Sequence, residues 1–392
     1  MNTNETIIRS MLDDDQYKFS MQAAILELFP DAIAHYRFIN RGKQRFNEEF
    51  LKALQYQVST FFPLFAISES EIEWYRKTCP YLKPWYFDYL RNYRYNPKQV
   101  KISLNEEKNL VIDIEGPWCE TVLWEVKLMA TVSELYFKII DTNWNRVGEA
   151  DRAKEKMNQL QDWNCITTDF GTRRRKDFLA QAMVVENMKP FNRFVGTSNV
   201  YLSYQNNMTP KGTQAHEWYQ AMQALFGIRH SNLFGMENWV KVYGGNLGIA
   251  LTDTLGTDLF LKDFDLRYAK LFDGVRCDSG NEMEFTDKIV AHYKKMKINP
   301  LTKTIIFSNA LDCRKAVDIS RYCRDVINCS FGIGTFFTND FPNSPALNMV
   351  IKLWSINGIP VVKTSDDKGK VMGDPEAIRV TNWECFGKSL DS

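Results

Sequence analysis

Apolar residues in the first third of the chain recur mainly at helical spacing. This pattern predicts helices over Asp15–Phe29 and Arg45–Phe62, and a third helix that is capped by Ser70 and ends at Cys79, directly before a proline. Residues 109–116 instead alternate apolar and polar positions and end on a glycine, which predicts a half-buried strand. These elements indicate a mixed α+β domain over residues 1–135.

From about residue 165 the pattern changes to short apolar runs, each followed by an amphipathic stretch. Such alternation is typical of parallel strands joined by crossover helices. The predicted strands are Ala182–Val185, Phe194–Val195, Leu247–Leu251, Leu271–Val275, Thr304–Phe307, Cys329–Phe331, Leu347–Leu353 and Pro360–Val362. Between them, apolar stripes at three- and four-residue steps run from Phe285 to Met296 and from Ala316 to Val326.

This succession predicts an irregular, TIM-like α/β barrel over residues 136–392, with an open doubly wound sheet as the alternative. The last roughly 20–40 residues could instead pack on the N-terminal domain.

Composition limits the chemistry of this fold. The 49 Lys and Arg residues balance 48 Asp and Glu residues, so there is no overall positive field to hold nucleic acid. The eight cysteines include no close pair that suits a zinc site or a dithiol redox centre. The N-terminus does not have the pattern of a signal peptide, and the apolar run Phe61–Ile67 is too short to span a bilayer. We expect a cytoplasmic protein that binds neither nucleic acid nor membrane.

Polar residues directly follow four of the predicted strands: Asp253, Asp278, Ser308 with Asn309, and the Gly332–Thr335 segment. Active sites of parallel α/β barrels are built at the C-terminal ends of the strands, so we expect these residues to meet. In the last segment, Gly334 and Thr335 suggest a phosphate contact, although its two glycines would also suit a tight turn.

Arg276 and Asp278 stand two residues apart and project to the same side of their strand. Arg276 could pair with a ligand carboxylate and Asp278 with a ribose hydroxyl or Mg²⁺, or the two could form an internal salt bridge. His216 is one of only four histidines and precedes Glu217. It could be a structural histidine or act as an acid–base or nucleophilic group.

Four cations follow Phe170: Arg173, Arg174, Arg175 and Lys176. They could contact phosphate oxygens while Phe170 presents a flat apolar face to a ring, or they could form a solvated helix start. The sequence does not fix which cation contacts which phosphate.

Together these segments resemble the nicotinate phosphoribosyltransferase family in its bacterial and fungal form, and the resemblance runs nearly end to end. The matching segments are residues 14–18, 169–174, 195–199, 212–217, 252–254, 275–280, 307–309 and 331–335. The resemblance implies an ATP-dependent enzyme that forms nicotinate mononucleotide and pyrophosphate from nicotinate and 5-phosphoribosyl 1-pyrophosphate, the first step of NAD salvage from nicotinate.

For the chemical centre, the resemblance implies that ATP phosphorylates His216, which Asp253 and Asp278 orient and polarise. It also implies Mg²⁺, which we expect the substrate phosphates to hold. Asn281 stands where many relatives carry an acid, which leaves no basis for a metal role at that position.

For the substrates, the resemblance implies that nicotinate lies between Phe170 and a Tyr17 from a second subunit, near Ser198, with Arg276 on its carboxylate. A homodimer with shared active sites is therefore expected. The phosphate and ribose contacts implied in the same way are Arg173, Arg174, Ser308, Asn309, Gly334 and Thr335, with Asp278 on the ribose hydroxyls.

Three other functions compete with this one. A nicotinamide phosphoribosyltransferase would benefit from a carboxylate where this chain has Ser198, so the acidic substrate is favoured. A sugar-phosphate barrel enzyme could use Gly332–Thr335 for phosphate but leaves His216 unexplained. A non-catalytic descendant of the fold would have no use for such a complete set of active-site groups.

Overall fold

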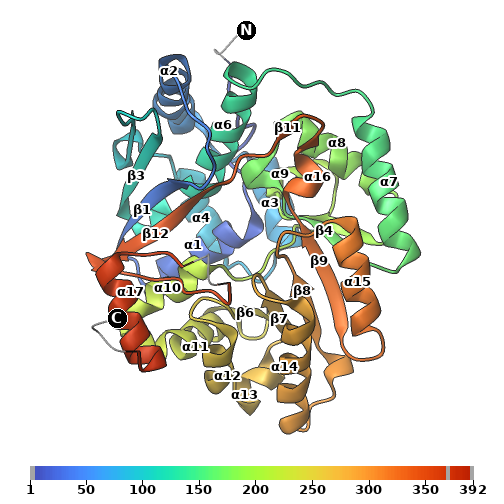
Figure 1. Cartoon of the computed structure of the whole chain (residues 1–392). Helices are drawn as coiled ribbons and strands as arrows, with labels where there is room; N and C mark the ends of the chain where they lie inside the picture. The colour runs from blue at the N-terminus through green and yellow to red at the C-terminus, as the bar shows by residue number, and fades with distance from the viewer. Residues whose placement is uncertain (1–4, 368–370, 389–392) are drawn as a thin grey trace.

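The computed structural model describes residues 5–367 and 371–388 and contains two main sheets (Figure 1). One has five antiparallel strands in the order β13-β12-β1-β3-β2, and the other has six parallel strands in the order β5-β4-β9-β8-β7-β6. The strands are β1 Ile33–Asn40, β2 Val100–Leu104, β3 Leu110–Pro117, β4 Thr167–Asp169, β5 Phe194–Thr197, β6 Ile249–Leu251, β7 Gly274–Cys277, β8 Thr304–Phe307, β9 Asn328–Ile333, β10 Asp340–Phe341, β11 Ser344–Pro345, β12 Met349–Ile356 and β13 Ile359–Pro360.

Helices cover both sheets. Those before β4 are α1 Gln16–Leu28, α2 Glu48–Tyr56, α3 Glu69–Thr78, α4 Pro84–Asn92, α5 Trp118–Thr121, α6 Trp124–Ile139 and α7 Glu149–Asp162. Those after β4 are α8 Phe178–Met188, α9 Val200–Gln205, α10 His216–Phe226, α11 Ser231–Tyr243, α12 Thr257–Asp263, α13 Leu266–Leu271, α14 Glu282–Lys295, α15 Cys313–Cys323, α16 Thr335–Thr338 and α17 Pro375–Phe386. Within the described chain, no helix combines the length and apolar composition needed to cross a bilayer.

The predicted helices of the first third form, with one correction at a cap. The α1 and α2 helices lie within the predicted ranges, and α2 continues into a π-helical turn over Gln57–Phe61. The α3 helix is capped by Ser68, not Ser70, because Ser68 accepts from the backbone of Glu71 while the Glu71 side chain accepts from the Ser68 backbone. This reciprocal pair satisfies two backbone donors at the helix start.

The antiparallel sheet joins distant parts of the chain. Strand β12, coloured red in Figure 1, pairs with the blue β1 over seven residue pairs. The strands predicted at Leu347–Leu353 and Pro360–Val362 thus form as β12 and β13, but their expected place in the barrel is wrong. The alternating burial of β12 explains this, because alternation suits an antiparallel sheet with one covered face better than a fully buried parallel strand.

The parallel sheet confirms the predicted α/β class. Strands β5 and β6 form its two edges in the described residues, so the sheet is an open, incomplete barrel. Two predictions fail: Ala182–Val185 lies inside α8, and the short β4 was missed. The other five predicted strands form as β5 to β9. Strand β7 is shifted towards the C-terminal side of its predicted range, because Leu271 still belongs to α13.

Strand ends define one edge of this sheet. Each of its six strands is followed, within two residues, by a residue of one of the segments singled out in the sequence. These residues are Phe170, Ser198, Asp253, Asp278, Ser308 and Gly334. Because parallel strands bring their carboxyl ends to the same edge, these residues surround one region of the molecule.

Candidate active site

A pocket of about 680 Å³ lies where this edge meets the N-terminal elements. Its lining combines residues of both sheets and of the helices between them: Asp15, Tyr17, Glu125, Phe170, Arg173, Ser198, Gly212, Thr213, Ala215, His216, Glu217, Gln220, Arg276, Asp278, Ile351, Lys352 and Leu353.

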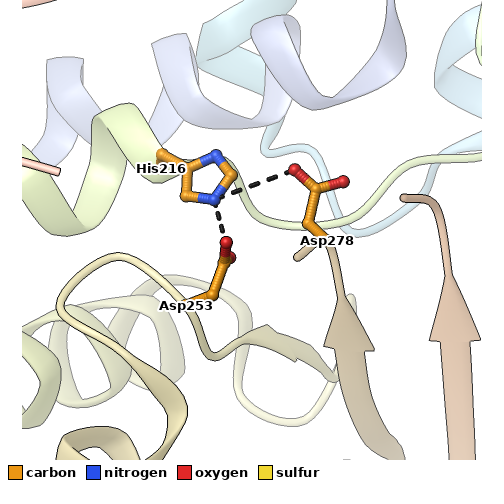
Figure 2. A group of neighbouring side chains, drawn as sticks. All are labelled: His216, Asp253 and Asp278. Carbon is orange, nitrogen blue, oxygen red and sulfur yellow. Dashed lines mark hydrogen bonds and ion pairs between the residues drawn. The ribbon is translucent and has the colours of Figure 1, made fainter. Parts of the chain in front are cut away.

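His216 is the first residue of α10 and points at two carboxylates (Figure 2). Its Nε2 lies 2.7 Å from Oδ1 of Asp253 and 3.8 Å from Oδ2 of Asp278. An ionised carboxylate only accepts hydrogen bonds, so Nε2 must carry the proton that it donates to Asp253. The lone pair of the neutral ring is then on Nδ1.

Burial dominates the titration of this group. Burial, reinforced by the charge of Lys363, lowers the pKa of His216 to about 4, although Asp253 and Asp278 act in the opposite direction. Burial alone would raise the pKa of Asp253, but His216 and Lys363 reverse that effect and hold it well below its usual range. The imidazole is therefore neutral and the carboxylate ionised near pH 7.

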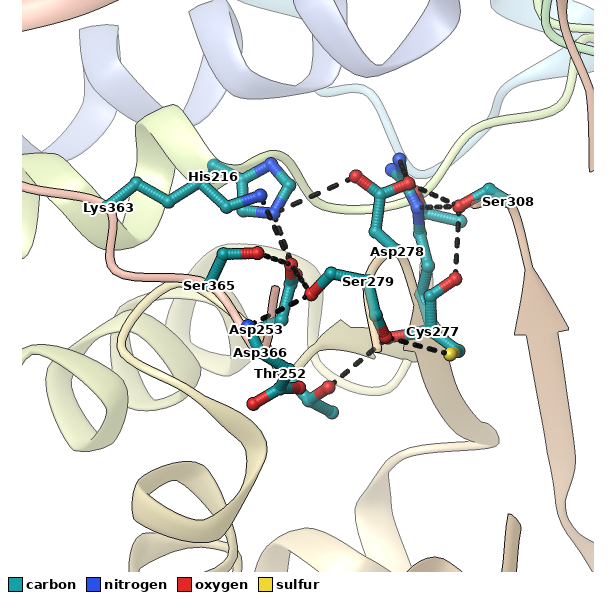
Figure 3. A network of polar contacts seen from close by, with 12 residues as sticks. His216, Thr252, Asp253, Cys277, Asp278, Ser279, Ser308, Lys363, Ser365 and Asp366 are labelled. Atoms are coloured by element: carbon teal, nitrogen blue, oxygen red, sulfur yellow. Dashed lines mark hydrogen bonds and ion pairs between the residues drawn. The ribbon is translucent and has the colours of Figure 1, made fainter. Parts of the chain in front are cut away.

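A polar network holds Asp253 in place (Figure 3). Its Oδ2 accepts from Ser279 Oγ at 2.6 Å and lies 3.1 Å from the ammonium of Lys363. The neighbouring Asp366 accepts from the backbone and hydroxyl of Thr257, at 2.9 and 2.6 Å. The segment that follows β13 thus reaches across to the loop after β6 and fixes the partner of His216.

Arg276 is tied to its surroundings by most of its N–H groups. It donates from Nε to Ser308 at 2.8 Å, from Nη1 to Thr213 at 2.8 Å and to the Gln214 carbonyl at 3.3 Å, and from Nη2 to Asp278 at 2.8 Å. The internal Arg276–Asp278 salt bridge therefore exists, and both residues also line the pocket. One Nη2 hydrogen is left over from these bonds.

Phe170 and Tyr17 of the same chain line this pocket. The expectation that Tyr17 comes from a second subunit is therefore wrong: α1 begins at Gln16, and the backbone of Gln16 donates to Ser198 at 2.8 Å, which holds Tyr17 against its own barrel. Ser198 also lines the pocket and donates from Oγ to Asp15 at 2.7 Å.

The four cations after Phe170 have four different environments. Arg173 lines the pocket and lies 3.3 Å from Glu125. Arg174 lines a second pocket. Arg175 is fully buried and donates two hydrogen bonds to Asp13, at 2.7 and 2.9 Å. Lys176 is fully buried, 3.3 Å from the centroid of a phenylalanine ring. The solvated alternative is wrong for Arg175 and Lys176, and their burial also keeps both from a phosphate.

The second pocket, of about 1010 Å³, gathers four of the residues expected to bind phosphate: Arg174, Ser308, Gly334 and Thr335. Asn309 is not among the residues that line either pocket, and its side chain donates to the Gly280 carbonyl at 3.4 Å and to Glu282 at 3.2 Å. Asn281 caps α14 by accepting from two backbone N–H groups, so its role is structural.

Several residues of the site were missed from the sequence. Lys352 lines the main pocket from β12, and burial lowers its pKa to about 8. Lys363 directly follows the predicted strand Pro360–Val362, so the rule that found Asp253 could have found it. Glu217 was noted from the sequence only as the acid beside His216, and Glu125 carried no signal beyond its charge. Their partners lie far away in the sequence.

Comparison with known proteins gives a consistent result. Residues 165–385 match the family described as nicotinate phosphoribosyltransferase (NAPRTase), and residues 12–133 match the N-terminal domain described for the same family. A protein of Methanosarcina acetivorans named nicotinate phosphoribosyltransferase is 45% identical, over 98% of this chain and 100% of the relative.

Solved structures agree. The crystal structure of nicotinate phosphoribosyltransferase from Porphyromonas gingivalis has a TM-score of 0.94 and 35% identity, covering 97% of this chain and 100% of that one. The corresponding structure from Vibrio cholerae has a TM-score of 0.93 and 33% identity, covering 98% and 94%.

Proposed function

The chain belongs to the nicotinate phosphoribosyltransferase family, and from this premise we propose that it joins nicotinate to the phosphoribosyl group of 5-phosphoribosyl 1-pyrophosphate, driven by ATP through phosphorylation of His216. One observation carries the proposal: a neutral imidazole, fixed by Asp253, stands at the wall of a pocket that also holds Phe170, Tyr17 and three cations.

The histidine is suited to accept a phosphoryl group. Its Nδ1 lone pair attacks the γ-phosphorus of ATP, the bond to the bridging oxygen breaks, and ADP leaves. The ring then carries a positive charge that the ionised Asp253 stabilises through Nε2–H. As the first residue of α10, His216 also places the phosphoryl oxygens near a helix N-terminus, which favours anions.

Nicotinate fits the main pocket as an anionic ring. The rings of Phe170 and Tyr17 provide apolar faces for the pyridine. Arg276 can donate one N–H to the nicotinate carboxylate, because its other N–H groups already donate to protein groups. Further positive charge comes from Arg173 and from Lys352, whose ammonium makes no ion pair with any described residue. Ser198 adds no negative charge of its own, which favours the acid over the amide.

The phosphates fit the second pocket. Gly334 and Thr335 stand at the start of α16, where backbone N–H groups can approach the 5′-phosphate, and Arg174 lies on the same wall. Ser308 lines the second pocket and joins it to the first, because its hydroxyl accepts from Arg276 and donates to Asp278, which both line the first. We place the ribose between them, with Asp278 on its hydroxyls.

The donor set also suits Mg²⁺. His216, Asp253 and Asp278 each offer a ligand atom within 4.8 Å of the others, but the oxygens of Asp253 are occupied by His216, Ser279 and Lys363. The protein can therefore supply Asp278 Oδ2 while substrate phosphates supply the remaining oxygens, an arrangement common for Mg²⁺. When bound, the ion would neutralise charge on the phosphates.

The transfer step needs positioning more than a strong base. The pyridine nitrogen of nicotinate attacks C1 of the ribose, the bond to pyrophosphate breaks, and the positive charge that develops on the ribose is stabilised by nearby carboxylates such as Asp278. Water then hydrolyses the phosphohistidine and resets the site. The predicted cytoplasmic location and homodimer stay predictions, and with Tyr17 in its own pocket one chain supplies both ring-stacking residues.

Product analysis tests the proposal. The purified chain is incubated with nicotinate, 5-phosphoribosyl 1-pyrophosphate and Mg²⁺, with and without ATP, and nicotinate mononucleotide is separated by chromatography. We expect product in the presence of ATP, and loss of the ATP stimulation in His216→Ala. Absence of nicotinate mononucleotide, or formation of a nucleotide only when nicotinamide replaces nicotinate, in which case it is nicotinamide mononucleotide, would overturn the proposal.

A further inference from the structure

Glu217, the neighbour of His216, has three side-chain donors around its carboxylate. Its Oε1 accepts from Tyr36 Oη at 2.6 Å and from Trp118 Nε1 at 2.8 Å, and its Oε2 lies 2.6 Å from the ammonium of Lys18. The Glu217 side chain is only 7% exposed and that of Lys18 is fully buried. Every donor to this carboxylate is thus withdrawn from water.

All three donors come from the N-terminal elements: Lys18 from α1, Tyr36 from β1 and Trp118 from α5. Glu217 lies in the first turn of α10, directly after His216. The carboxylate therefore ties the helix that carries the phosphorylated residue to a different part of the molecule.

Lys18 connects this anchor to the nicotinate pocket. Its ammonium lies 5.5 Å from the centroid of the Tyr17 ring and 2.5 Å from Glu125 Oε2. Glu125 in turn lies 3.3 Å from Arg173, which lines the pocket. A continuous chain of charges thus runs from the residue beside His216 to the ring and the cation that face nicotinate, and it is buried up to the half-buried Arg173.

We propose that the Lys18–Glu217 ion pair is a positioning element that sets His216 and Tyr17 relative to each other, and so couples phosphorylation of the enzyme to nicotinate binding. The inference rests on the proposed function. Neither residue touches the reacting atoms. Glu217 acts through the start of α10, and Lys18 acts through the Tyr17 ring. Displacement of a reacting group by about 1 Å can lower a rate about 100-fold, so a modest shift at either end has a measurable effect.

Glu217→Gln tests this while leaving the fold supported, because Lys18 keeps its ion pair with Glu125 and the amide oxygen can still accept from Tyr36 and Trp118. We expect the KM for nicotinate to rise and the rate of His216 phosphorylation to fall, each by about tenfold, with more ATP hydrolysed per nicotinate mononucleotide formed. A purely structural role would lower the melting temperature without changing these three quantities.

Glu134→Gln is the matched control. Glu134 is a buried carboxylate with its own lysine partner, Lys138 at 2.7 Å, and it does not line the pocket. We expect this variant to lose stability with an unchanged KM for nicotinate. If Glu217→Gln does not fold, Tyr36→Phe replaces it, since that change removes one hydrogen bond to Glu217 and no charge; a smaller change in the same direction is then expected.

The outcomes separate the two proposals. If the wild type is neither labelled by ATP nor makes nicotinate mononucleotide, the proposed function fails. If the wild type does both and the folded Glu217→Gln variant, or Tyr36→Phe in its place, keeps wild-type KM, phosphorylation rate and ATP stoichiometry, only the coupling role of the Lys18–Glu217 pair is overturned.

Discussion

Replacing Asp253 by asparagine changes one atom in the centre of the site. In the wild type, Asp253 accepts from His216 Nε2 at 2.7 Å, which fixes the proton on Nε2 and leaves Nδ1 free to attack. An asparagine can present its NH₂ group to Nε2 instead. The imidazole proton would then move to Nδ1 and block the nucleophilic nitrogen.

The expected size of the effect follows from the bond that is lost. A hydrogen bond to a charged group contributes about 1.5–3 kcal/mol. If that energy stabilises the imidazolium in the transition state, its loss slows phosphorylation about 10- to 150-fold. The change also leaves the buried Lys363 without its carboxylate at 3.1 Å, so the melting temperature falls as well.

The assay is the initial rate of label transfer from γ-labelled ATP, corrected for the folded fraction measured by circular dichroism. Asp113→Asn is the control, because Asp113 also bonds a histidine, His35 at 2.9 Å, but on β1 and outside the pocket. It should keep the wild-type rate. A folded Asp253→Asn variant that is labelled at the wild-type rate would refute the role given to the Asp253–His216 bond.

Three further predictions follow from the same geometry. The pKa of His216 is lowered to about 4 in the folded state, so His216 contributes stability that is complete above the unfolded pKa of about 6.5 and is lost as the pH falls towards 4. The difference in unfolding free energy between wild type and His216→Gln should therefore shrink as the pH falls through that window. A difference that does not change with pH would contradict this prediction. Ser198→Asp places a second carboxylate beside Asp15, whose Oδ1 lies 2.7 Å from the Ser198 hydroxyl in the wild type. The KM for nicotinate should rise at least about tenfold, and the KM for nicotinamide should rise less. An equal rise in KM for both substrates would argue against a charge effect. A Cβ on Gly332 would lie 2.2 Å from the Phe170 ring, so Gly332→Ala should displace that ring and raise the KM for nicotinate without slowing ATP labelling. In the control Gly245→Ala the nearest neighbour of the new Cβ lies at 3.9 Å, so the KM should stay at the wild-type value. An unchanged KM in Gly332→Ala would contradict the place given to Phe170.

The sequence predicts the site best where the fold is locally regular. Asp253, Asp278, Ser308 and Gly334 were found because each follows a short apolar run, and parallel strands bring such positions together whatever the details of packing. The α8 segment shows the limit of that approach. Ala182–Val185 is apolar because one helix buries it, and a short apolar run does not distinguish a strand from a buried helix.

Long-range pairing decided the rest. Arg175 finds Asp13, a partner 162 residues away, so neither its burial nor its distance from the phosphates could be read from the run of cations. Lys352 was missed because β12 returns to pair with β1, which carries a residue from the end of the chain into the pocket. The family resemblance predicts that a second subunit supplies Tyr17. In the structure, the contact between α1 and the loop at Ser198 holds Tyr17 in the pocket of its own chain.

The most direct test of the account is to expose the purified protein to γ-labelled ATP and Mg²⁺ and to treat the labelled product with acid and with base. His216→Ala is compared with His35→Ala, since His35 also bonds an aspartate but lies outside the pocket. The account predicts label that is lost in acid, kept in base, absent from His216→Ala and present in His35→Ala. A wild-type protein that takes up no label, or a His216→Ala variant that is labelled equally well, would contradict it.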